Sequence, residues 1–535
     1  MTNSDLLVHL LEEAGVRWVF GIPSGPVLPL IESLRKSSVR FVLTASETSA
    51  GFMAATVGSL SGIPGVCVST VGPGATNLTT GVGAAWLDRS PVIAITCNVA
   101  TPWLERRVQM RIDHHGLFRP LTKATFSLRQ GQVGETLARA IALARTEPPG
   151  PVHLDLPEDT AEESVDETAN ANLNRLIAKN ALPDLSNELA EKVSVALRTA
   201  RRPLLVTGLT FTRSKSGKQL LRFVECQNLP FVTTLHAKGF LPESHPNWAG
   251  VIGRARRSDV RAFTDKADLV LAIGYDPIEI NYEEWVGKTP IMHVGTEAAE
   301  ESKDLSFIWN RACDLDRAIE ALTRLAGSSD ARSVEEWQEH RGSLERALRP
   351  LGHGFALHDV LDILRRKLPL DGVLAYDVGA HTHQIATQWR TDHRHTCLAT
   401  NGWSSMGYGM PAAFAAKLIS PDRTVVAIVG DGGFQMTAGE LAMARRLNLA
   451  VPTIVLNDGW LGLMKVKQEH KHYPLSGVYL GDPPESPAHY FGAPCRAAKS
   501  PEEFREALNW AFALNGPSVI EAFTDVGPYS ATVFD

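Results

Sequence analysis

Short apolar runs alternate with longer segments of mixed apolar and polar residues along the first part of the chain. Four such runs, which are typical of buried strands, lie at residues 18–20, 41–43, 65–70 and 92–96. The segment 6–14 before them has the spacing of a helix, with Ser4 as its expected N-cap. Short buried strands separated by helical segments predict a parallel, doubly wound sheet.

The same alternation occurs twice more. A second unit begins near Ser186, another expected helix N-cap, and its strands are expected at residues 203–207, 230–234, 269–273 and 290–294. A third unit begins near Leu357, and its strands are expected at residues 372–376, 424–429, 451–456 and 518–521. A further helix is predicted between these two units, at residues 335–347.

Two polar stretches mark the expected boundaries between the units. Residues 159–185 begin with an acidic run and have the composition of an inter-domain linker, and residues 327–332 form a second polar stretch. A chain of 535 residues has room for three or four domains of roughly 150 residues each. We therefore predict an α/β protein of three doubly wound parallel-sheet domains, at residues 1–165, 186–330 and 355–535.

Composition excludes several classes of function. Hydrophobic residues make up 44% and charged residues 21%, and the net charge is −6, which is ordinary for a globular protein and gives no basic footprint for nucleic acid. The sequence contains no polybasic run, no run of 18 apolar residues and no signal-peptide pattern at its N-terminus. The six cysteines are scattered and form no C-x-x-C pair, which disfavours zinc sites and disulfides. We expect a cytoplasmic protein with reduced thiols, with neither membrane nor nucleic acid as a partner.

The clearest chemical signal is Gly430-Asp431-Gly432-Gly433, which follows an expected strand and precedes a helix with its body at residues 439–447. Glycines let the backbone approach a phosphate closely, and a helix N-terminus attracts anions. Asp431 could hold a hard cation such as Mg²⁺ against the phosphates. Asp458 follows the next expected strand, so both carboxylates should lie at one edge of the sheet. The alternative, a simple turn, is weakened by this second carboxylate.

Other motifs with known chemistry do not compete with this one. The sequence has no Walker A phosphate loop, no G-x-S-x-G and no H-E-x-x-H. No complete G-x-G-x-x-G opens a helix after the first strand of either of the first two units.

Together these features resemble the thiamine diphosphate enzymes of the acetolactate synthase and 2-oxo acid decarboxylase superfamily, over essentially the whole chain. Gly430-Asp431-Gly432 and Asn457-Asp458 resemble the family's G-D-G…N-N motif, with Asp458 where the family usually has Asn. The segment 274–279 resembles the catabolic, flavin-independent acetolactate synthases in particular. Further resemblance lies in residues 20–29, 44–54, 72–77, 117–123, 377–381 and 405–413.

The resemblance implies a role for each matching residue. The N-terminal domain would bind the pyrimidine of thiamine diphosphate, and the C-terminal domain would bind its diphosphate through Mg²⁺. Asp431, Asp458 and the backbone carbonyl of Trp460 would be the metal ligands. Glu47 would be the cofactor-activating glutamate. Contacts to the cofactor are expected from Ser24, Gly25, Gly72, Asn77, His381, Gly430, Gly432 and Gly433, and from Met406 as the wedge that holds the cofactor bent.

The matching motifs are less specific for the substrate than for the cofactor. Gln109, His114 and His115 are the candidates for contact with the substrate, and Lys123 lies in the same region. Either histidine could be a proton relay or merely a solvated loop residue.

The resemblance implies a carboligase, similar to acetolactate synthase, that decarboxylates a 2-oxo acid such as pyruvate and adds the remaining acyl unit to a second carbonyl. The alternative is a non-oxidative 2-oxo acid decarboxylase or C–C lyase, similar to benzoylformate decarboxylase, with a different or bulkier substrate. A silent, regulatory family member is the hypothesis from another class, and the presence of Glu47, Asp431 and Asn457 argues against it.

The resemblance also bears on assembly and on a second cofactor. Family members share their active sites between subunits, so a homodimer or homotetramer is expected. The central domain of anabolic relatives binds flavin, but Gly208 and the residues after it form no glycine-rich phosphate turn. FAD is therefore not expected.

Overall fold

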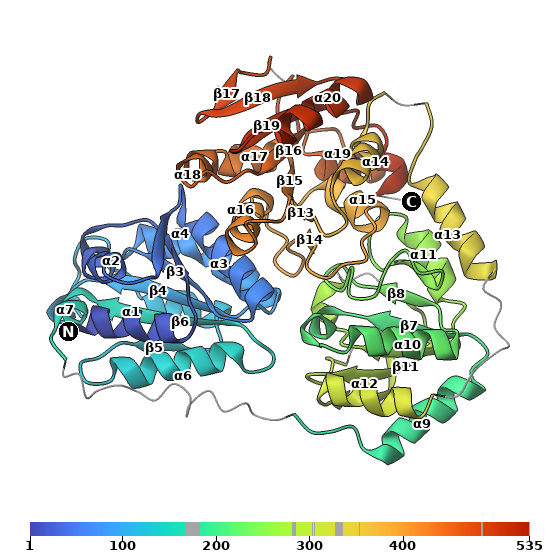
Figure 1. Ribbon diagram of the computed structural model, residues 1–535, viewed down its shortest axis with the longest axis horizontal. Helices are drawn as coiled ribbons and strands as arrows, with labels where there is room; N and C mark the ends of the chain where they lie inside the picture. The colour runs from blue at the N-terminus through green and yellow to red at the C-terminus, as the bar shows by residue number, and fades with distance from the viewer. Residues whose placement is uncertain are drawn as a thin grey trace.

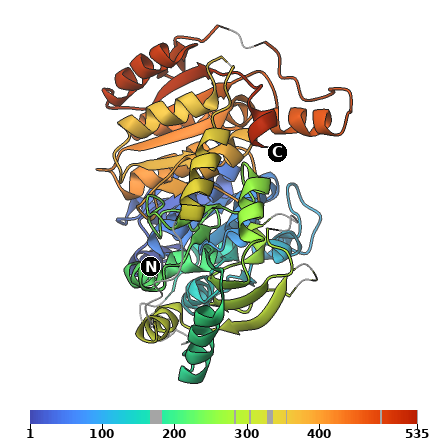
Figure 2. The same cartoon turned by 90° about the vertical axis from the view of Figure 1, so that its right-hand side faces the viewer.

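The computed structural model describes the chain except for residues 166–181, 281–284, 302, 304, 327–334, 353, 483–484 and 534–535. Three α/β units follow one another along the chain, each built on one sheet with helices on its faces (Figure 1). The C-terminal unit lies over the other two (Figures 1 and 2). The predicted fold class, three doubly wound and mainly parallel sheets, is confirmed.

The N-terminal unit contains a six-stranded, fully parallel sheet in the order β2-β1-β3-β4-β6-β5. Its strands are β1 (Trp18–Gly21), β2 (Arg40–Leu43), β3 (Gly65–Ser69), β4 (Val92–Asn98), β5 (Thr125–Ser127) and β6 (Pro151–Pro157). Its helices are α1 (Asn3–Glu13), α2 (Leu28–Arg35), α3 (Glu47–Ser61), α4 (Pro73–Leu87), α5 (His114–Phe118), α6 (Val133–Arg145) and α7 (Glu158–Glu162).

Two sequence-based expectations about this unit are corrected. The first helix is capped by Thr2 and not by Ser4, because the Thr2 hydroxyl accepts from the Asp5 N–H while the Asp5 carboxylate accepts from the Thr2 N–H. Residues 159–165 are not linker. They form α7 and the segment after it, where Ser164 pairs with Thr2. Residues 166–181 of the expected linker lie outside the described residues.

The central unit contains a second six-stranded parallel sheet, in the order β12-β11-β10-β7-β8-β9. Its strands are β7 (Pro203–Thr207), β8 (Phe231–Thr233), β9 (Trp248–Val251), β10 (Leu269–Ile273), β11 (Pro290–Gly295) and β12 (Ser306–Ala312). Its helices are α9 (Asn187–Thr199), α10 (Gly217–Gln227), α11 (Arg257–Thr264), α12 (Leu315–Arg324) and, leading to the third unit, α13 (Glu335–Ala347). Ser186 caps α9, as predicted.

The C-terminal unit contains a seven-stranded sheet in the order β14-β13-β15-β16-β19-β18-β17, in which only the β17–β18 pair is antiparallel. Its strands are β13 (Val373–Tyr376), β14 (Cys397–Leu398), β15 (Val425–Gly430), β16 (Pro452–Asn457), β17 (His489–Tyr490), β18 (Ala493–Ala498) and β19 (Ser518–Phe523). Its helices are α14 (Leu357–Lys367), α15 (Ala380–Gln388), α16 (Gly409–Ile419), α17 (Asp431–Thr437), α18 (Glu440–Arg446), α19 (Gly462–His470), α20 (Pro501–Phe512) and α21 (Tyr529–Thr532).

Small residues allow the N-terminal and C-terminal units to pack closely. One buried hydrophobic cluster includes residues of α3, α4 and the alanine-rich α16. Helix α16 packs against α3, and α4 meets the C-terminal unit at Gly83, where a Cβ atom would lie 2.6 Å from the ring of Trp403. The resulting interface fixes the start of α3 relative to the C-terminal unit.

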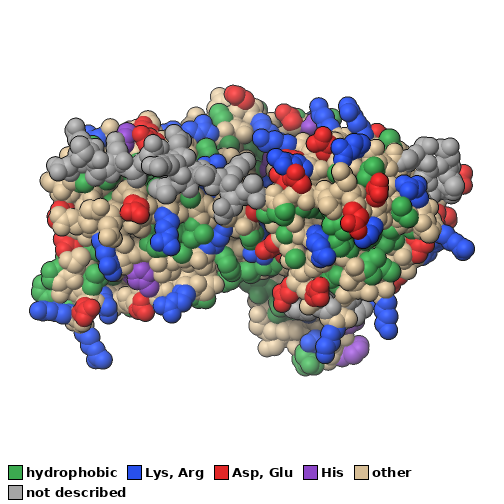
Figure 3. Space-filling view, turned by 90° about the horizontal axis from the view of Figure 1, so that it is seen from below, with side chains coloured by type: hydrophobic (Ala, Val, Ile, Leu, Met, Phe, Trp, Pro, Cys, Tyr) green, Lys and Arg blue, Asp and Glu red, His purple; other side chains and the backbone are tan. Residues whose placement is uncertain are grey.

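The surface seen in Figure 3 carries acidic and basic side chains intermixed, without separation by sign. Among the described residues, no helix combines the length and the apolar character that crossing a bilayer requires.

Candidate functional site

Two carboxylates lie at the ends of neighbouring strands in the C-terminal unit. Strands β15 and β16 pair in parallel with Gly430 opposite Leu456, so Asp431 and Asp458 emerge at the same edge of the sheet. One carboxylate oxygen of Asp431 accepts from the Gly432 N–H at 2.7 Å, and the other accepts from the Gly459 N–H at 2.8 Å. Asp458 accepts from the N–H of Trp460 at 2.9 Å. The helix predicted at residues 439–447 is α18, and a separate helix, α17, begins at Asp431 itself, so the carboxylate lies in its first turn.

The electrostatics of this pair favour a bound cation. Burial, together with the nearby charge of Asp431, raises the pKa of Asp458 to about 8. Burial also raises the pKa of Asp431. Two buried like charges are unfavourable unless a positive charge lies between them. The pair therefore suits a hard divalent cation.

The number of ligands indicates which kind of metal fits. Across the described residues, no group of three or more His, Cys, Asp or Glu side chains could hold a metal ion by itself. Mg²⁺ is commonly bound through one or two carboxylates, with phosphate oxygens and water completing its octahedron. Asp431 and Asp458 thus fit Mg²⁺ that arrives with a diphosphate.

Glycines keep the space next to this turn open. A Cβ atom on Gly433 would lie 1.9 Å from a carboxylate oxygen of Asp377, and one on Gly432 would lie 3.0 Å from the terminal methyl of Met406. Asp377 is buried and accepts from the N–H groups of Gly407 and Tyr408 at 2.9 and 3.1 Å. Its carboxylate therefore anchors the segment that carries Met406 against the turn.

His381 supplies a hydrogen-bonding group at the same place. It lies in the first turn of α15, and a Cβ atom on Gly430 would lie 3.3 Å from its ring. Its Nε2 atom is buried and has no hydrogen-bond partner. Burial lowers the pKa of His381 to about 4, so the imidazole is neutral near pH 7. A neutral ring that carries its proton on Nε2 can donate to a phosphate oxygen, which fits the expected diphosphate.

Glu47 is the first residue of α3, where the Ser46 side chain caps the helix by accepting from the Ser49 N–H. Its side chain is buried, with 7% of the residue exposed, and it accepts from the Asn77 side-chain amide at 3.2 Å. Gly74 provides room for it, because a Cβ atom there would lie 3.1 Å from a Glu47 carboxylate oxygen. The structure thus places Glu47 against the first turns of α4, which carry Gly74 and Asn77.

Ser24 and Gly25 lie at the start of a short turn after β1. The Ser24 hydroxyl is buried without a hydrogen-bond partner, and a Cβ atom on Gly25 would meet nothing within 4 Å. Gly72 has a φ of +68° and is approached by the loop that carries Gln109, because a Cβ atom on Gly72 would lie 2.2 Å from the Met110 carbonyl oxygen. Gln109 itself is exposed.

The histidine pair has partners within the N-terminal unit. His114 is fully buried, with its Nδ1 atom 2.9 Å from an Asp155 carboxylate oxygen and its Nε2 atom accepting from the Gly72 N–H at 3.3 Å. The ring nitrogens of His115 lie 2.8 Å from the hydroxyls of Thr125 and Ser127. Both rings are thus engaged, and His114 holds the backbone of the Gly72 turn in place.

Lys123, expected on the substrate side, is held by the backbone. Its ammonium donates to the carbonyls of Thr146 and Pro148 at 2.7 and 2.8 Å. Burial lowers its pKa to about 8.

Within one chain, the residues around Glu47 and the residues around Asp431 and Asp458 belong to different units. The hydrogen bonds of the Glu47 side chain remain in the N-terminal unit, whereas those of Asp431 and Asp458 remain in the C-terminal unit. A bridge between the units is Glu440 of α18, whose carboxylate accepts from the N–H groups of Ala45 and Ser46 at 2.9 to 3.1 Å. It holds the start of α3 next to Glu47.

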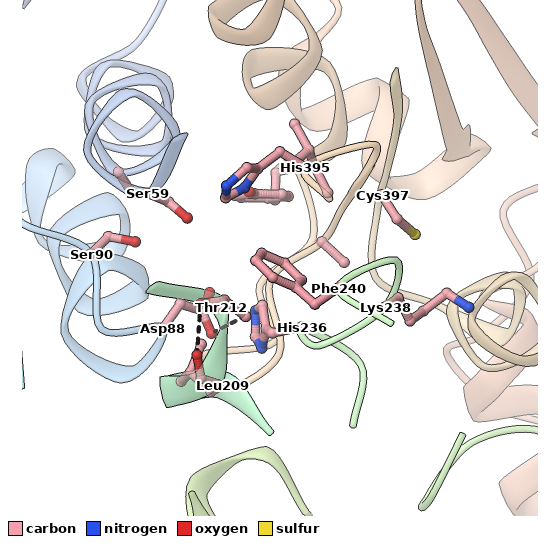
Figure 4. Close-up of a pocket in the computed structure, with 14 residues that line it drawn as sticks. Ser59, Asp88, Ser90, Leu209, Thr212, His236, Lys238, Phe240, His395 and Cys397 are labelled. Atoms are coloured by element: carbon pink, nitrogen blue, oxygen red, sulfur yellow. Dashed lines mark hydrogen bonds and ion pairs between the residues drawn. The ribbon is translucent and has the colours of Figure 1, made fainter. Parts of the chain in front are cut away.

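All three units meet around Asp88, which follows α4 (Figure 4). The Asp88 carboxylate accepts from the Thr400 hydroxyl at 2.6 Å and from the N–H of Gly402 at 2.8 Å. The Nε2 atom of His236, from the central unit, lies 3.7 Å from the same carboxylate, beside a cavity of about 50 Å³. The junction thereby fixes the beginning of the segment that leads to Met406.

His236 also contacts a buried carboxylate of its own unit. Its Nδ1 atom lies 3.0 Å from Glu279, which accepts from the Leu209 N–H at 2.7 Å as well. Burial works to lower the pKa of His236, but the hydrogen bond to Glu279 and the charge of Asp88 outweigh it and raise the pKa overall.

Sequence reasoning did not identify Glu440, Asp88, His236 or Asp377 as site residues. Asp377 lies in a segment of family resemblance, which is a signal that could have marked it. The other three act through partners in different units, and the sequence carries no local signal of those contacts.

The chain matches three models of thiamine pyrophosphate enzymes, pyrophosphate being another name for the diphosphate. The N-terminal TPP binding domain matches residues 1–117, the central domain matches residues 190–336 and the C-terminal TPP binding domain matches residues 377–522. The order of these matches is the order of the three sheets.

Curated relatives align along nearly the whole chain. The probable acetolactate synthase large subunit of Methanocaldococcus jannaschii is 30% identical, over 98% of this chain and 92% of its own length. The catabolic acetolactate synthase of Raoultella terrigena is 30% identical, over 97% and 94%. The acetolactate synthase of Bacillus subtilis is 28% identical, over 98% and 93%. The chain therefore belongs to the thiamine pyrophosphate enzymes, as an acetolactate synthase-like, thiamine diphosphate-dependent enzyme.

Proposed function

We propose that this enzyme is a Mg²⁺-dependent carboligase that decarboxylates pyruvate and adds the remaining acyl unit to a second carbonyl compound. The observation that carries the cofactor part is the buried pair Asp431 and Asp458 beside the unpartnered Nε2 atom of His381. The similarity to acetolactate synthases along nearly the whole chain supports pyruvate and the carboligation outcome.

Each residue has a distinct part in this proposal. When bound, thiamine diphosphate supplies the electron-accepting ring on which a 2-oxo acid can lose carbon dioxide. Asp431, Asp458 and the Trp460 carbonyl hold Mg²⁺, and His381 donates to the diphosphate. Glu47 hydrogen-bonds the aminopyrimidine ring, and Met406 supports the bend of the cofactor. Gln109 contacts the substrate, whereas His114 acts through the Gly72 turn that it holds.

We also propose that the central unit binds no flavin. Dinucleotides bind at the carboxyl ends of the strands in doubly wound sheets, with the phosphates on backbone N–H groups. Here the N–H groups of Leu209 and His236, just after β7 and β8, donate to the buried carboxylate of Glu279 at 2.7 and 3.2 Å. An internal carboxylate therefore takes the place of a phosphate, which supports a domain that carries no FAD.

The first test is product analysis by proton NMR after the enzyme is mixed with thiamine diphosphate, Mg²⁺ and pyruvate. We expect acetolactate, or acetoin formed from it. Acetaldehyde alone would favour the decarboxylase alternative. Unchanged pyruvate, with cofactor binding shown by thermal stabilisation, would contradict pyruvate as the donor and lead to bulkier 2-oxo acids.

We also propose a homodimer or homotetramer with active sites shared between subunits, in the cytoplasm. In the single chain, exposed apolar side chains lie near the site residues of the N-terminal unit and near those of the C-terminal unit. Leu28 and Met110 are 58% and 46% exposed on the N-terminal side, and Met436 is 63% exposed on α17. Apolar groups exposed around a site mark a surface that a partner covers.

Mixing inactive variants tests the shared site. We expect a 1:1 mixture of Glu47→Gln and Asp431→Asn subunits, after reassembly, to recover about a quarter of the wild-type activity, because half of the random dimers contain one intact site. Activity is measured after subunit exchange has been verified by native mass spectrometry. Complete exchange without recovered activity would show that both residues of a site come from one chain.

A further inference from the structure

Asp155 is a buried carboxylate of the N-terminal unit that the proposed chemistry does not use. It lies near the end of β6, opposite Thr96 of β4, and is 4% exposed. Its carboxylate accepts from His114 Nδ1 at 2.9 Å, from the Thr96 hydroxyl at 3.0 Å and from the Asn98 amide at 3.1 Å. Donors from β4 and from α5 therefore converge on this one side chain.

Asp155 is ionised near pH 7. Burial works to raise its pKa, but the hydrogen bonds and charges of its neighbours, first of all His114, outweigh burial and lower the pKa overall. A carboxylate can only accept hydrogen bonds, so the His114 Nδ1 atom that faces it must carry a proton. The Thr96 hydroxyl, 2.9 Å from the same nitrogen, gives its own proton to Asp155 and faces the ring as a second acceptor.

The proton on Nδ1 decides what the other ring nitrogen of His114 can do. A neutral imidazole carries one proton, so its Nε2 atom is an acceptor. This atom accepts from the Gly72 N–H at 3.3 Å. The opposite tautomer and a doubly protonated ring would both set N–H against N–H. Asp155 thus favours the one form of His114 that can hold the Gly72 turn.

The Gly72 turn determines where the helix beside Glu47 begins. Gly72 is the N-cap of α4. The first turns of α4 contact the Glu47 carboxylate, since the Asn77 amide donates to it at 3.2 Å and Gly74 leaves room for it. A shift of the N-cap would therefore move the residues that surround Glu47.

His114 also ends the loop that carries Gln109. It is the first residue of α5, which follows this loop. The Met110 carbonyl oxygen of the loop lies against the turn, 2.2 Å from where a Cβ atom on Gly72 would be. One imidazole therefore anchors both the turn and the loop.

We propose that Asp155 is a positioning residue for the reaction, because it fixes the tautomer through which His114 holds the Gly72 turn. Through the turn it sets the start of α4 beside Glu47, and through His114 it fixes the loop of Gln109. The inference rests on the proposed roles of Glu47 and Gln109.

Asp155→Asn tests the tautomer with little change of shape. In the wild type both Asp155 oxygens accept from the Asn98 amide, whereas an asparagine has one oxygen and one NH₂ group. With its oxygen toward Asn98, the substituted side chain turns its NH₂ group to His114 Nδ1, which must then accept. The imidazole proton moves to Nε2, and the Gly72 N–H loses its acceptor.

The double variant Asn98→Asp with Asp155→Asn is the rescue. The carboxylate at position 98 accepts from the NH₂ group at position 155, so the amide oxygen turns back to His114. Thr96→Val is the matched control. It removes a hydroxyl that donates to Asp155 and leaves His153 without an acceptor, which lowers stability, but it retains the carboxylate that selects the tautomer.

Hydrogen exchange in the cofactor-free enzyme, followed by mass spectrometry of peptides that contain Gly72, measures the hold on the turn. We expect exchange there to quicken about tenfold or more in Asp155→Asn, and to stay within about threefold of the wild type in the double variant and in Thr96→Val. With thiamine diphosphate and Mg²⁺, turnover should fall about tenfold to a hundredfold in Asp155→Asn and recover in the double variant.

Unchanged exchange at Gly72 in Asp155→Asn would overturn the proposal, and so would equal acceleration in Thr96→Val, because stability alone would then explain the effect. Wild-type turnover in Asp155→Asn would overturn the positioning role. A folded double variant with fast exchange would overturn the tautomer as the cause. The exchange experiment uses neither cofactor nor substrate, so unchanged pyruvate with the wild type would contradict the proposed function and not the hold of Asp155 on the turn.

Discussion

Replacement of Glu47 by glutamine is expected to lower turnover of the 2-oxo acid by about 10²–10⁴-fold, the usual contribution of a positioned acid–base group. The substitution retains the size of a side chain that is buried at the start of α3 and accepts from the Asn77 amide. Glutamine can still accept that hydrogen bond, so the fold and the binding of thiamine diphosphate should survive. Steady-state kinetics and cofactor-induced thermal shifts measure the two effects separately.

Glu440→Gln is the matched control for this substitution. Glu440 is likewise buried and lies at the same end of α3, but its carboxylate accepts from the backbone N–H groups of Ala45 and Ser46. Its loss should cost about 1–3 kcal/mol of unfolding free energy, with a far smaller effect on turnover than Glu47→Gln. Equal losses of turnover in both variants would mean that Glu47 acts only by positioning α3.

The central strands of each sheet could be predicted because they are continuous apolar runs. Strands β7, β10 and β15 are buried at nearly every position, as the sequence pattern indicates. Of the edge strands, β2 was predicted but β5, β9, β12, β14 and β17 were not, and the interior strands β6 and β18 were also missed. In β12 only intermediate and exposed positions occur, and β14 and β17 have two residues each. Such strands are formed by pairing with their neighbours, and no local apolar run marks them.

In the candidate site, too, some features could be predicted from the sequence and others could not. The positions of Asp431 and Asp458 follow from a strand, a turn and a helix that are local in the sequence, so their common edge could be predicted. The hydrogen-bond partners of His114 could not be predicted. Its ring meets Asp155 on β6, which is 41 residues further along the chain, and the backbone of Gly72. Contacts of this kind depend on the order of strands in the sheet, which single-chain periodicity does not specify.

The substitutions Asp458→Asn and Asp431→Asn should have opposite effects on the stability of the metal-free enzyme. Asparagine at position 458 can still accept from the Trp460 N–H, and it removes a carboxyl that must take up a proton near pH 7 when it is buried beside Asp431, since its pKa is raised to about 8. We expect the free energy of unfolding to rise by about 1–3 kcal/mol. At position 431 both carboxylate oxygens accept from backbone N–H groups, so an asparagine NH₂ would face a donor and stability should fall by about 1–3 kcal/mol.

Metal binding should fall in both variants, because each loses negative charge at the Mg²⁺ site. The affinity for Mg²⁺ in the presence of thiamine diphosphate should decrease by about tenfold or more in Asp458→Asn, which retains one oxygen ligand, and further in Asp431→Asn. Denaturant unfolding in EDTA, compared with unfolding in Mg²⁺ and thiamine diphosphate, measures both quantities. A stability change of the same sign in the two metal-free variants would contradict the opposition of two buried carboxylates. In that case, only the geometry of the turn would account for the site.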